Sequence, residues 1–377
     1  MQRLNLRSHQ SYLHSFRAAV QARLEKFYGQ KLAHVTTREI ARDQGQLLAY
    51  KGLDQVDRSP AGVIPSQKIS VSPLELYGSK QMVLNGQFFT EHTVGGIATR
   101  LNKGATRVKF GQKFFIPPKK LAYEICASGY GHLLEISMGE RHMFQLAFGI
   151  QQLAKEMGTA HWTDVLARQK MLIVPNEDGE QRTIDAFRKH SFFGFEPKNV
   201  MFVSSRFYPS LVLESGVLRF NESHRILHNH GIVPMQICME NEIFTVNPDT
   251  GEKTTVPRWK YRDVLSQMLN KISYNVEDLD FFRKPIDYRA IAITVQFALR
   301  GYRMVMQIVP QNQKDPQKGG MYGVDTDLSH PITAKRGRGV VIESFQLDLP
   351  PEKLADGSDN PEYVRALLDI GWINRNN

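Results

Sequence analysis

The sequence is poor in cysteine, with two among 377 residues. Cys126 and Cys238 stand far apart, outside any spacing typical of a metal-binding or redox pair, so we expect reduced thiols packed in the core. Long apolar runs are also missing, which argues against a membrane-spanning helix, and the first residues lack the apolar block of a secretory signal. We therefore expect a cytoplasmic protein with no membrane partner.

Acidic residues are too few to balance the basic ones: 48 Lys and Arg stand against 38 Asp and Glu, a formal net charge of +10. An excess of positive charge favours anionic partners such as nucleotides, nucleic acid or membrane phosphates, and does not choose among them. The hydrophobic share of 41% and the charged share of 23% are those of an ordinary globular protein. A chain of 377 residues can bury a large core and divide into more than one lobe.

Hydrophobic periodicity divides the chain into three parts. Apolar side chains recur at helical spacing over residues 9–30, which predicts an amphipathic helix, and this periodicity disappears over residues 50–74. From Met82 onward, short apolar runs alternate with helical stretches, the pattern of an α/β domain with a largely parallel sheet. We expect an N-terminal helical extension and connection at 1–75, a central α/β domain at 76–350 and a C-terminal segment at 351–377.

Within the central domain the same periodicity assigns individual elements. Strands are predicted at residues 82–89, 171–174, 200–203 and 303–309, and helices at residues 141–157, 183–190, 259–272 and 287–299. Gly158 follows the first of these helices as its expected C-terminal cap.

A glycine-rich basic segment follows the first expected strand. Its glycines include Gly95, Gly96 and Gly104, its basic side chains are Arg100, Lys103, Arg107, Lys109 and Lys113, and no acidic residue occurs between Glu91 and Glu124. Paired glycines let main-chain amides approach an anion closely, arginine can bind two phosphate oxygens, and lysine adds a compact point charge. The segment is typical either of a phosphate-binding turn or of a tight turn with a solvated cationic face. Its spacing matches neither the dinucleotide fingerprint nor the Walker loop.

These residues resemble a known family. The stretch GGIATRL at 95–101, followed by Lys109, is similar to the signature loop of the UDP-sugar pyrophosphorylases, the UDP-glucose and UDP-N-acetylglucosamine pyrophosphorylase-like nucleotidyltransferases. The chain also resembles later motifs of the family, in the same order, at residues 191–203, 273–280, 317–320 and 340–347. The resemblance implies a Rossmann-like, GT-A-like nucleotidyltransferase fold, α/β in class, with a mixed, mostly parallel sheet flanked by helices and ligands bound at its carboxyl edge.

The resemblance also implies a reaction, in which a sugar 1-phosphate attacks the α-phosphorus of UTP, or of another nucleoside triphosphate, and pyrophosphate leaves. Mg²⁺ is the implied cofactor. The catalytic residues would be Arg100, Lys109 and Lys318, and Glu277 or Asp278 would hold the metal. The residues implied to bind the nucleotide are Gly95, Gly96, Ala98, Thr99, Asn229, His230 and Gly231. The alternatives are a helix-capping turn at the acids and a flexible basic loop around Lys318.

The sequence departs from the family's pattern at several places. Residues 224–236 stand where the family has a Gly-x-Gly-Asp motif, and Ser204 and Ser205 stand where it has a glutamine near the uracil. Glu277 and Asp278 stand where the family has aspartate and asparagine. The histidines at 224, 228 and 230 also suit a metal cluster or ordinary surface positions. Two rivals therefore stay open: a non-catalytic or altered-specificity relative of the same fold, and a basic nucleic-acid-binding protein, suggested by residues 107–120.

Overall fold

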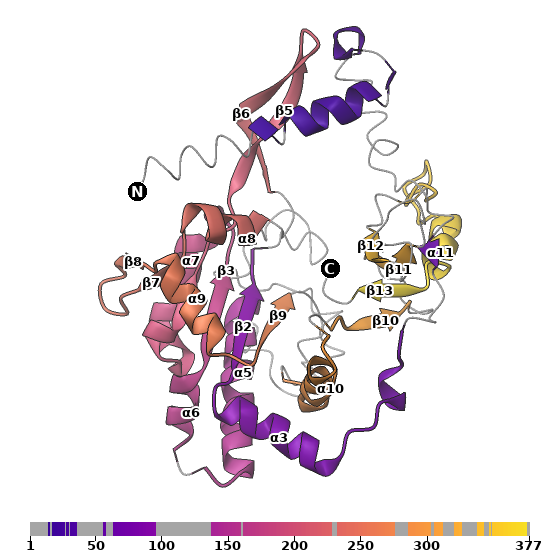
Figure 1. Ribbon diagram of the computed structural model, residues 1–377. Coiled ribbons are helices and arrows are strands. Elements are labelled where there is room, and N and C mark those ends of the chain that lie inside the picture. Colours follow the sequence, from indigo (N-terminus) through magenta and orange to yellow (C-terminus); the bar gives the residue numbers. More distant parts are fainter. Residues whose placement is uncertain are drawn as a thin grey trace. The chain divides into compact units, whose positions relative to one another are not determined.

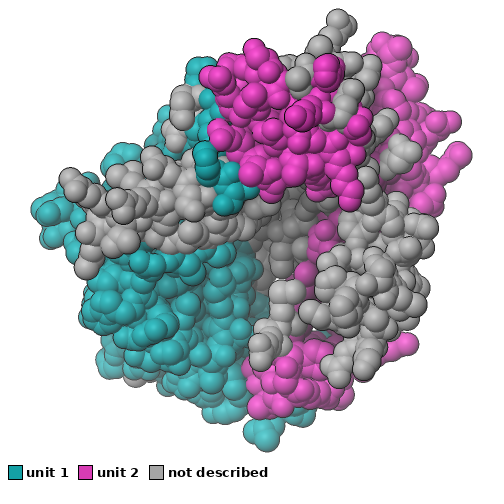
Figure 2. Space-filling view, turned by 45° about the horizontal axis from the view of Figure 1, so that its top comes forward, with its two compact units in different colours: residues 1–15, 71–210, 220–292 teal, residues 16–70, 211–219, 293–377 magenta. Residues whose placement is uncertain are grey.

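The structure is a computed structural model, and the residues it describes are 14–15, 17–26, 28–29, 31–35, 56–57, 63–95, 137–159, 161–227, 232–275, 286–302, 305–311, 320–325, 338–342, 347 and 349–374. The chain divides into two compact units, which Figure 2 distinguishes by colour. Unit 1 comprises residues 1–15, 71–210 and 220–292, and unit 2 comprises residues 16–70, 211–219 and 293–377. The three-part division expected from the sequence stays a prediction.

Unit 1 is built on a six-stranded sheet in the order β8-β7-β4-β3-β2-β9 (Figure 1). The strands are β2 (Phe88–Thr93), β3 (Lys170–Val174), β4 (Val200–Phe202), β7 (Phe244–Val246), β8 (Lys253–Thr255) and β9 (Asn270–Asn275). Strands β4, β3, β2 and β9 are parallel to their neighbours, and β7 and β8 extend the sheet antiparallel. The mixed, mostly parallel sheet predicted from the sequence is confirmed.

Helices cover both faces of this sheet. The helical segments of this unit are α3 (Pro73–Leu84), α5 (Met138–Glu156), α6 (Trp162–Arg168), η8 (Glu177–Gly179), α7 (Glu180–Lys189), η9 (Ser191–Gly194), η10 (Pro197–Asn199), α8 (Ile232–Met235), η11 (Gln236–Glu240) and α9 (Arg258–Ser266), and α10 (Tyr288–Leu299) begins in this unit and continues into unit 2. Successive side chains of a strand point to opposite faces, so Phe89 packs with Ile237 and Tyr261 on one face. Phe88 borders a small cavity with Ile150 of α5 on the other.

Helix α5 forms where the sequence predicts a helix. Its N-terminus is a capping box, in which the Ser137 side chain accepts a hydrogen bond from the Glu140 amide and the Glu140 side chain accepts one from the Ser137 amide. Its apolar stripe is buried, with Met143, Leu146, Ile150 and Leu153 at most 2% exposed. Gly158 follows with a φ of 69°, the left-handed conformation that glycine adopts without strain, so the predicted cap is confirmed.

The Phe-Phe-Gly segment forms a left-handed turn between α7 and β4. Ser191, Phe192, Phe193 and Gly194 have φ values of 47°, 54°, 57° and 84°. Each non-glycine residue in this region costs about 1–2 kcal/mol. Burial offsets the cost, because the rings of Phe192 and Phe193 pack edge-on against Phe187 and are at most 5% exposed.

Several predicted elements are wrong in extent. The strand expected at 82–89 begins at Phe88, because Met82–Leu84 close helix α3 and a turn at Gly86, with a φ of 64°, separates the two. The helix expected at 259–272 ends at Ser266, and residues from Asn270 form β9 instead. Of the strand expected at 303–309, the described part is extended only from Ile308 to Pro310. Cys238, expected in the core, is exposed and unpaired; Cys126 lies outside the described residues.

Unit 2 holds a smaller antiparallel sheet in the order β1-β11-β13-β10, with β12 paired to β11. Its elements are η1 (Leu32–His34), β1 (Val56–Asp57), η4 (Ser66–Lys68), β10 (Ile308–Pro310), β11 (Met321–Asp325), β12 (Arg338–Ile342), α11 (Pro361–Leu368) and β13 (Trp372–Asn374). The hairpin β5 (Phe207–Glu214) and β6 (Val217–Leu227) has its tip in this unit, where Leu218 packs with Leu24 and Leu32. The described residues between 14 and 28 are helical, as predicted for the N-terminal extension.

In the described part of the chain, no helix is both long enough and apolar enough to cross a membrane.

Candidate active site

The carboxyl edge of the parallel strands in unit 1 is tied together by main-chain hydrogen bonds. The Val94 amide, just after β2, donates to Val174 of β3 at 2.9 Å, and the Val203 amide, just after β4, donates to Ile173 at 3.1 Å. Because parallel strands end at the same edge, the loops that follow them meet there. The glycine-rich turn starts at this edge, directly after β2.

Asn176, which is 1% exposed, connects three of these loops. Its side-chain nitrogen Nδ2 donates to the Gly95 carbonyl at 2.9 Å, and its Oδ1 accepts from the Gly179 amide at 2.8 Å, which caps the helical segment that leads into α7. The Ser205 amide donates to the Pro175 carbonyl at 2.8 Å, next to Asn176. One amide side chain thus fixes the ends of β2 and β3 to the start of a helix.

Gly95 lies so close to this asparagine that no other residue fits. A Cβ atom at Gly95 would stand 2.6 Å from the Asn176 main-chain nitrogen and 2.9 Å from the Pro175 carbonyl carbon. Its φ is outside the left-handed region, so the requirement for glycine comes from close backbone approach and not from an unusual conformation. Close packing therefore requires glycine at the first position of the expected phosphate-binding turn, in addition to any role in binding phosphate.

A buried cluster of rings lies just before the ends of β2 and β9. His92 of β2 is fully buried, and its Nδ1 is 2.9 Å from Nε2 of His142 on α5. Nε2 of His92 is 2.9 Å from the Thr90 hydroxyl oxygen. The His92 ring stacks on Tyr274 of β9, with 5.0 Å between centroids and 8° between planes.

Burial sets the protonation of this cluster. Loss of water, and to a smaller degree the charge of His142, holds the pKa of His92 well below its ordinary value of 6.5. Burial likewise raises the pKa of the Tyr274 phenol. Both rings are therefore neutral at neutral pH: His92 stacks on Tyr274 and forms its hydrogen bonds with His142 and Thr90.

Ser204 and Ser205 lie just after β4. The Ser204 hydroxyl donates to Glu180, and the Ser204 carbonyl accepts from Gln236 Nε2 at 2.9 Å. Gln236 is 1% exposed and also donates to Glu242 at 2.9 Å. Its Oε1 is buried with no hydrogen-bond partner in the described part of the chain. Sequence inspection gave no role to Gln236.

Of the residues implied to act on the nucleotide, the structure describes Gly95 alone. The remaining predicted site residues, Gly96, Ala98, Thr99, Arg100, Lys109, Asn229, His230, Gly231, Glu277, Asp278 and Lys318, lie outside the described residues, and their roles stay predictions. Sequence inspection missed Asn176, although a Pro-Asn pair directly after the apolar run of β3, followed by an Asp-Gly pair, is a turn signal. It also missed His92 and Tyr274, for which the sequence holds no such signal.

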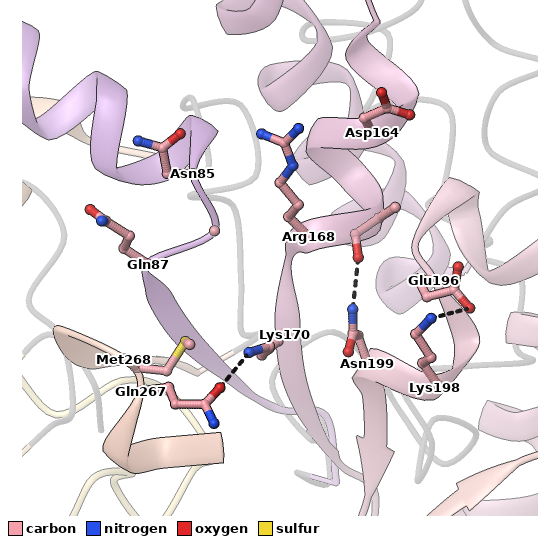
Figure 3. A pocket seen from close by; sticks show the side chains of 12 residues that line it. Asn85, Gln87, Asp164, Arg168, Lys170, Glu196, Lys198, Asn199, Gln267 and Met268 are labelled. Carbon is pink, nitrogen blue, oxygen red and sulfur yellow. Dashed lines mark hydrogen bonds and ion pairs between the residues drawn. The ribbon is translucent and has the colours of Figure 1, made fainter. Parts of the chain in front are cut away.

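A groove of about 650 Å³ opens at the opposite, amino edge of the same strands. Figure 3 shows its lining: the Lys170 ammonium lies 3.5 Å from the Gln267 side-chain oxygen, and the Lys198 ammonium lies 4.0 Å from Glu196. The Asn199 amide donates to a carbonyl of α6 at 2.7 Å. In open α/β sheets ligands bind outside the carboxyl ends of the strands, so we place the candidate site at that edge and not in the groove.

Comparison with known proteins identifies the fold. No family model matches the sequence, and no curated protein matches it either. The structure is similar to that of a single-residue variant of UDP-glucose pyrophosphorylase from Leishmania major, with a TM-score of 0.51 and 10% identity over 96% of this chain and 62% of that one. A UDP-N-acetylglucosamine pyrophosphorylase from Trypanosoma brucei, in complex with an inhibitor, gives a TM-score of 0.48 and 13% identity over 80% of this chain and 48% of that one.

This chain thus spans less than two thirds of the length of either protein. The first likeness shows that the chain has the Rossmann-like nucleotidyltransferase fold that the sequence predicts. The resemblance to the UDP-sugar pyrophosphorylases is confirmed at the level of the fold.

Proposed function

We propose that the chain is a nucleotidyltransferase that joins a sugar 1-phosphate to UTP and releases pyrophosphate. The observation that supports this most is the parallel register of β2 and β9, in which Thr93 lies opposite Asn275. The glycine-rich turn begins at Gly95, and the acidic pair begins at Glu277, two residues beyond each strand end. Two residues of chain reach no farther than about 7 Å. Phosphate-binding amides and carboxylates therefore start from neighbouring points of one edge.

The proposed reaction asks the protein for alignment and charge neutralisation. An oxygen of the sugar phosphate attacks the α-phosphorus of UTP, the bond from that phosphorus to the pyrophosphate oxygen breaks, and no covalent enzyme intermediate forms. The amides of Gly95 and Gly96 would bind phosphate oxygens, and Arg100 and Lys109 would neutralise the leaving pyrophosphate. Lys318 would bind the sugar phosphate or the α-phosphate.

The acids after β9 suit a magnesium ion. Mg²⁺ at a phosphate site takes one or two carboxylates and completes its shell with phosphate oxygens and water. Glu277 and Asp278, which the sequence resemblance implies as ligands, are the residues we propose to hold it. The ion would lower the negative charge of the phosphates.

The direct test is pyrophosphate release from each of the four nucleoside triphosphates, with glucose 1-phosphate and N-acetylglucosamine 1-phosphate as acceptors. We expect Mg²⁺-dependent turnover that is highest with UTP. Arg100→Ala should lower kcat at least about 100-fold, the usual scale for a lost transition-state contact, and Lys103→Ala in the same segment should leave it near the parent value. Absence of turnover in every pairing would remove the proposal, and salt-sensitive RNA binding in its place would favour the nucleic-acid-binding rival.

A further inference from the structure

Histidine is an unusual choice for the centre of a parallel sheet. Central parallel strands are normally continuous apolar runs, because both faces of the sheet are covered. His92 occupies such a place between β3 and β9 and is fully buried. Burying an imidazole costs free energy unless both ring nitrogens find partners. In this chain both do: Nδ1 meets His142, and Nε2 meets Thr90, each at 2.9 Å.

Two of the partners of His92 come from other elements. His142 belongs to α5, where it is 7% exposed, and Tyr274 belongs to β9, where its ring stacks on His92. The His142 ring also lies 5.9 Å from the Tyr274 ring, centroid to centroid. The three rings therefore form one packed group, each touching the other two, that connects β2, β9 and α5.

The group lies immediately before the two strand ends that matter for the proposed function. In the register of the sheet His92 is opposite Tyr274 and Thr93 is opposite Asn275. The Thr93 hydroxyl donates to the Tyr274 carbonyl at 2.9 Å, which adds a side-chain bond between the two strands at this level. Gly95 follows His92 by three residues, and Glu277 follows Tyr274 by three residues.

We propose that His92, His142 and Tyr274 are positioning residues, which fix the end of β2 against the end of β9, the two points from which the glycine-rich turn and the acidic segment continue. Apolar side chains would fill the same space, but apolar contacts tolerate small shifts, whereas a buried imidazole with both nitrogens hydrogen-bonded favours a single arrangement. Such a group would control the distance between the main-chain amides proposed to bind phosphate and the carboxylates proposed to bind the metal. This inference rests on the proposed function, because it assigns the cluster to the same site.

His142→Ala tests the proposal, because it removes the hydrogen-bond partner of His92 from α5 and leaves β2 and β9 unaltered in sequence. Misplacement of reacting groups by about 1 Å costs on the order of 100-fold in rate. We expect kcat to fall about 10- to 100-fold, the Mg²⁺ concentration for half-maximal activity to rise, and the KM for UTP to change less than about threefold. His142→Gln, whose amide can donate to the same ring nitrogen, should restore kcat to within about threefold of the parent value.

The matched control is Leu153→Ala, on the same helix and 1% exposed. It creates a cavity and lowers stability without touching the cluster, so at a temperature where both variants are folded its kcat should equal that of the parent. Equal losses in the two variants, or failure of His142→Gln to restore kcat, would overturn the positioning role. Tyr274→Leu, which removes the stacked ring from the β9 side, gives a second reading should His142→Ala fail to fold, with the same expected split between kcat and KM.

A readout independent of activity separates this inference from the proposed function. Amide hydrogen exchange of the peptides that contain Thr93 and Asn275 should rise in His142→Ala and stay unchanged in Leu153→Ala. If the parent protein turns over no substrate pair, the proposed function fails, and the exchange data still decide whether the cluster holds both strand ends. Unchanged exchange at both ends in His142→Ala would reject the positioning role, whatever the activity.

Discussion

The two edges of the parallel sheet in unit 1 are built differently. At the carboxyl edge, buried Asn176 makes hydrogen bonds of 2.8 and 2.9 Å to neighbouring loops, and Gly95 packs where no Cβ would fit. At the amino edge a groove is open, and its lysines meet their nearest polar partners at 3.5 and 4.0 Å. Both edges hold a closely packed glycine and a buried amide side chain, Asn176 at the carboxyl edge and Gln169 at the amino edge, so the described difference between them is the groove. The proposed in-line transfer requires fixed geometry, and we keep the candidate site at the carboxyl edge, where ligands bind in open α/β sheets.

A pair of glycine substitutions gives the largest expected difference between the edges. Gly95→Ala at the carboxyl edge places a Cβ 2.6 Å from the Asn176 nitrogen, and Gly86→Ala at the amino edge places one 2.5 Å from the Arg168 carbonyl oxygen. Both contacts are with backbone, so both variants should lose at least about 1–3 kcal/mol of unfolding free energy. Gly95→Ala alone should lower kcat, by about 100-fold, because only its backbone leads into the turn that we propose to bind phosphate.

Urea unfolding and pyrophosphate release, measured on the same preparations, check this pair. Activity is measured without urea, at a temperature where both variants retain the parent's circular dichroism, and is compared per folded molecule. Equal kcat losses at Gly95 and Gly86 would mean that the two edges do not differ in function.

Two asparagine substitutions sharpen the comparison at a smaller scale. Asn176→Ala leaves the Gly95 carbonyl and the Gly179 amide without that side chain, and each lost buried partner costs about 1–3 kcal/mol. We expect a loss of about 2 kcal/mol and a kcat roughly tenfold lower. Asn199→Ala removes a single bond to the Ala167 carbonyl at the amino edge, so a loss of about 1 kcal/mol with unchanged kcat is expected. A larger loss of kcat in Asn199→Ala than in Asn176→Ala would place the candidate site at the amino edge instead of the carboxyl edge.

The buried imidazole predicts a pH effect of about 1 kcal/mol. Burial, with the charge of His142, holds the pKa of His92 well below 6.5 in the folded protein. Below about pH 6.5 the unfolded chain gains a proton that the folded chain does not. The free energy of unfolding therefore decreases as the pH is lowered, by up to about 1.4 kcal/mol per pH unit. His92→Asn lacks this contribution. Its stability deficit should therefore narrow between pH 7.5 and pH 5.5 in urea titrations, and a constant or widening deficit would contradict the assigned pKa direction.

The sequence predicts the layered fold better than it predicts the site. The apolar runs of β3 and β4 and the stripe of α5 are local patterns, and each is found in the structure. The error at β2 was avoidable, because Asn85 and Gly86 form a turn signal inside the expected strand. The site depends on distant contacts: Gly95 is glycine because of Asn176, 81 residues later, and His92 is satisfied by His142, 50 residues later. No local pattern encodes such pairs.

The smallest effect is expected from the charges of the groove. Lys198 and Glu196 are 4.0 Å apart, and the lysine side chain is 78% exposed. Water screens such a pair, and exposed pairs contribute little to stability. Lys198→Ala should therefore leave the urea midpoint and kcat close to the parent values, with any change in unfolding free energy within about 0.5 kcal/mol. A kcat loss above about threefold, with the urea midpoint unchanged, would show that the amino edge takes part in the reaction and that fixed geometry at the carboxyl edge is not sufficient to locate the site.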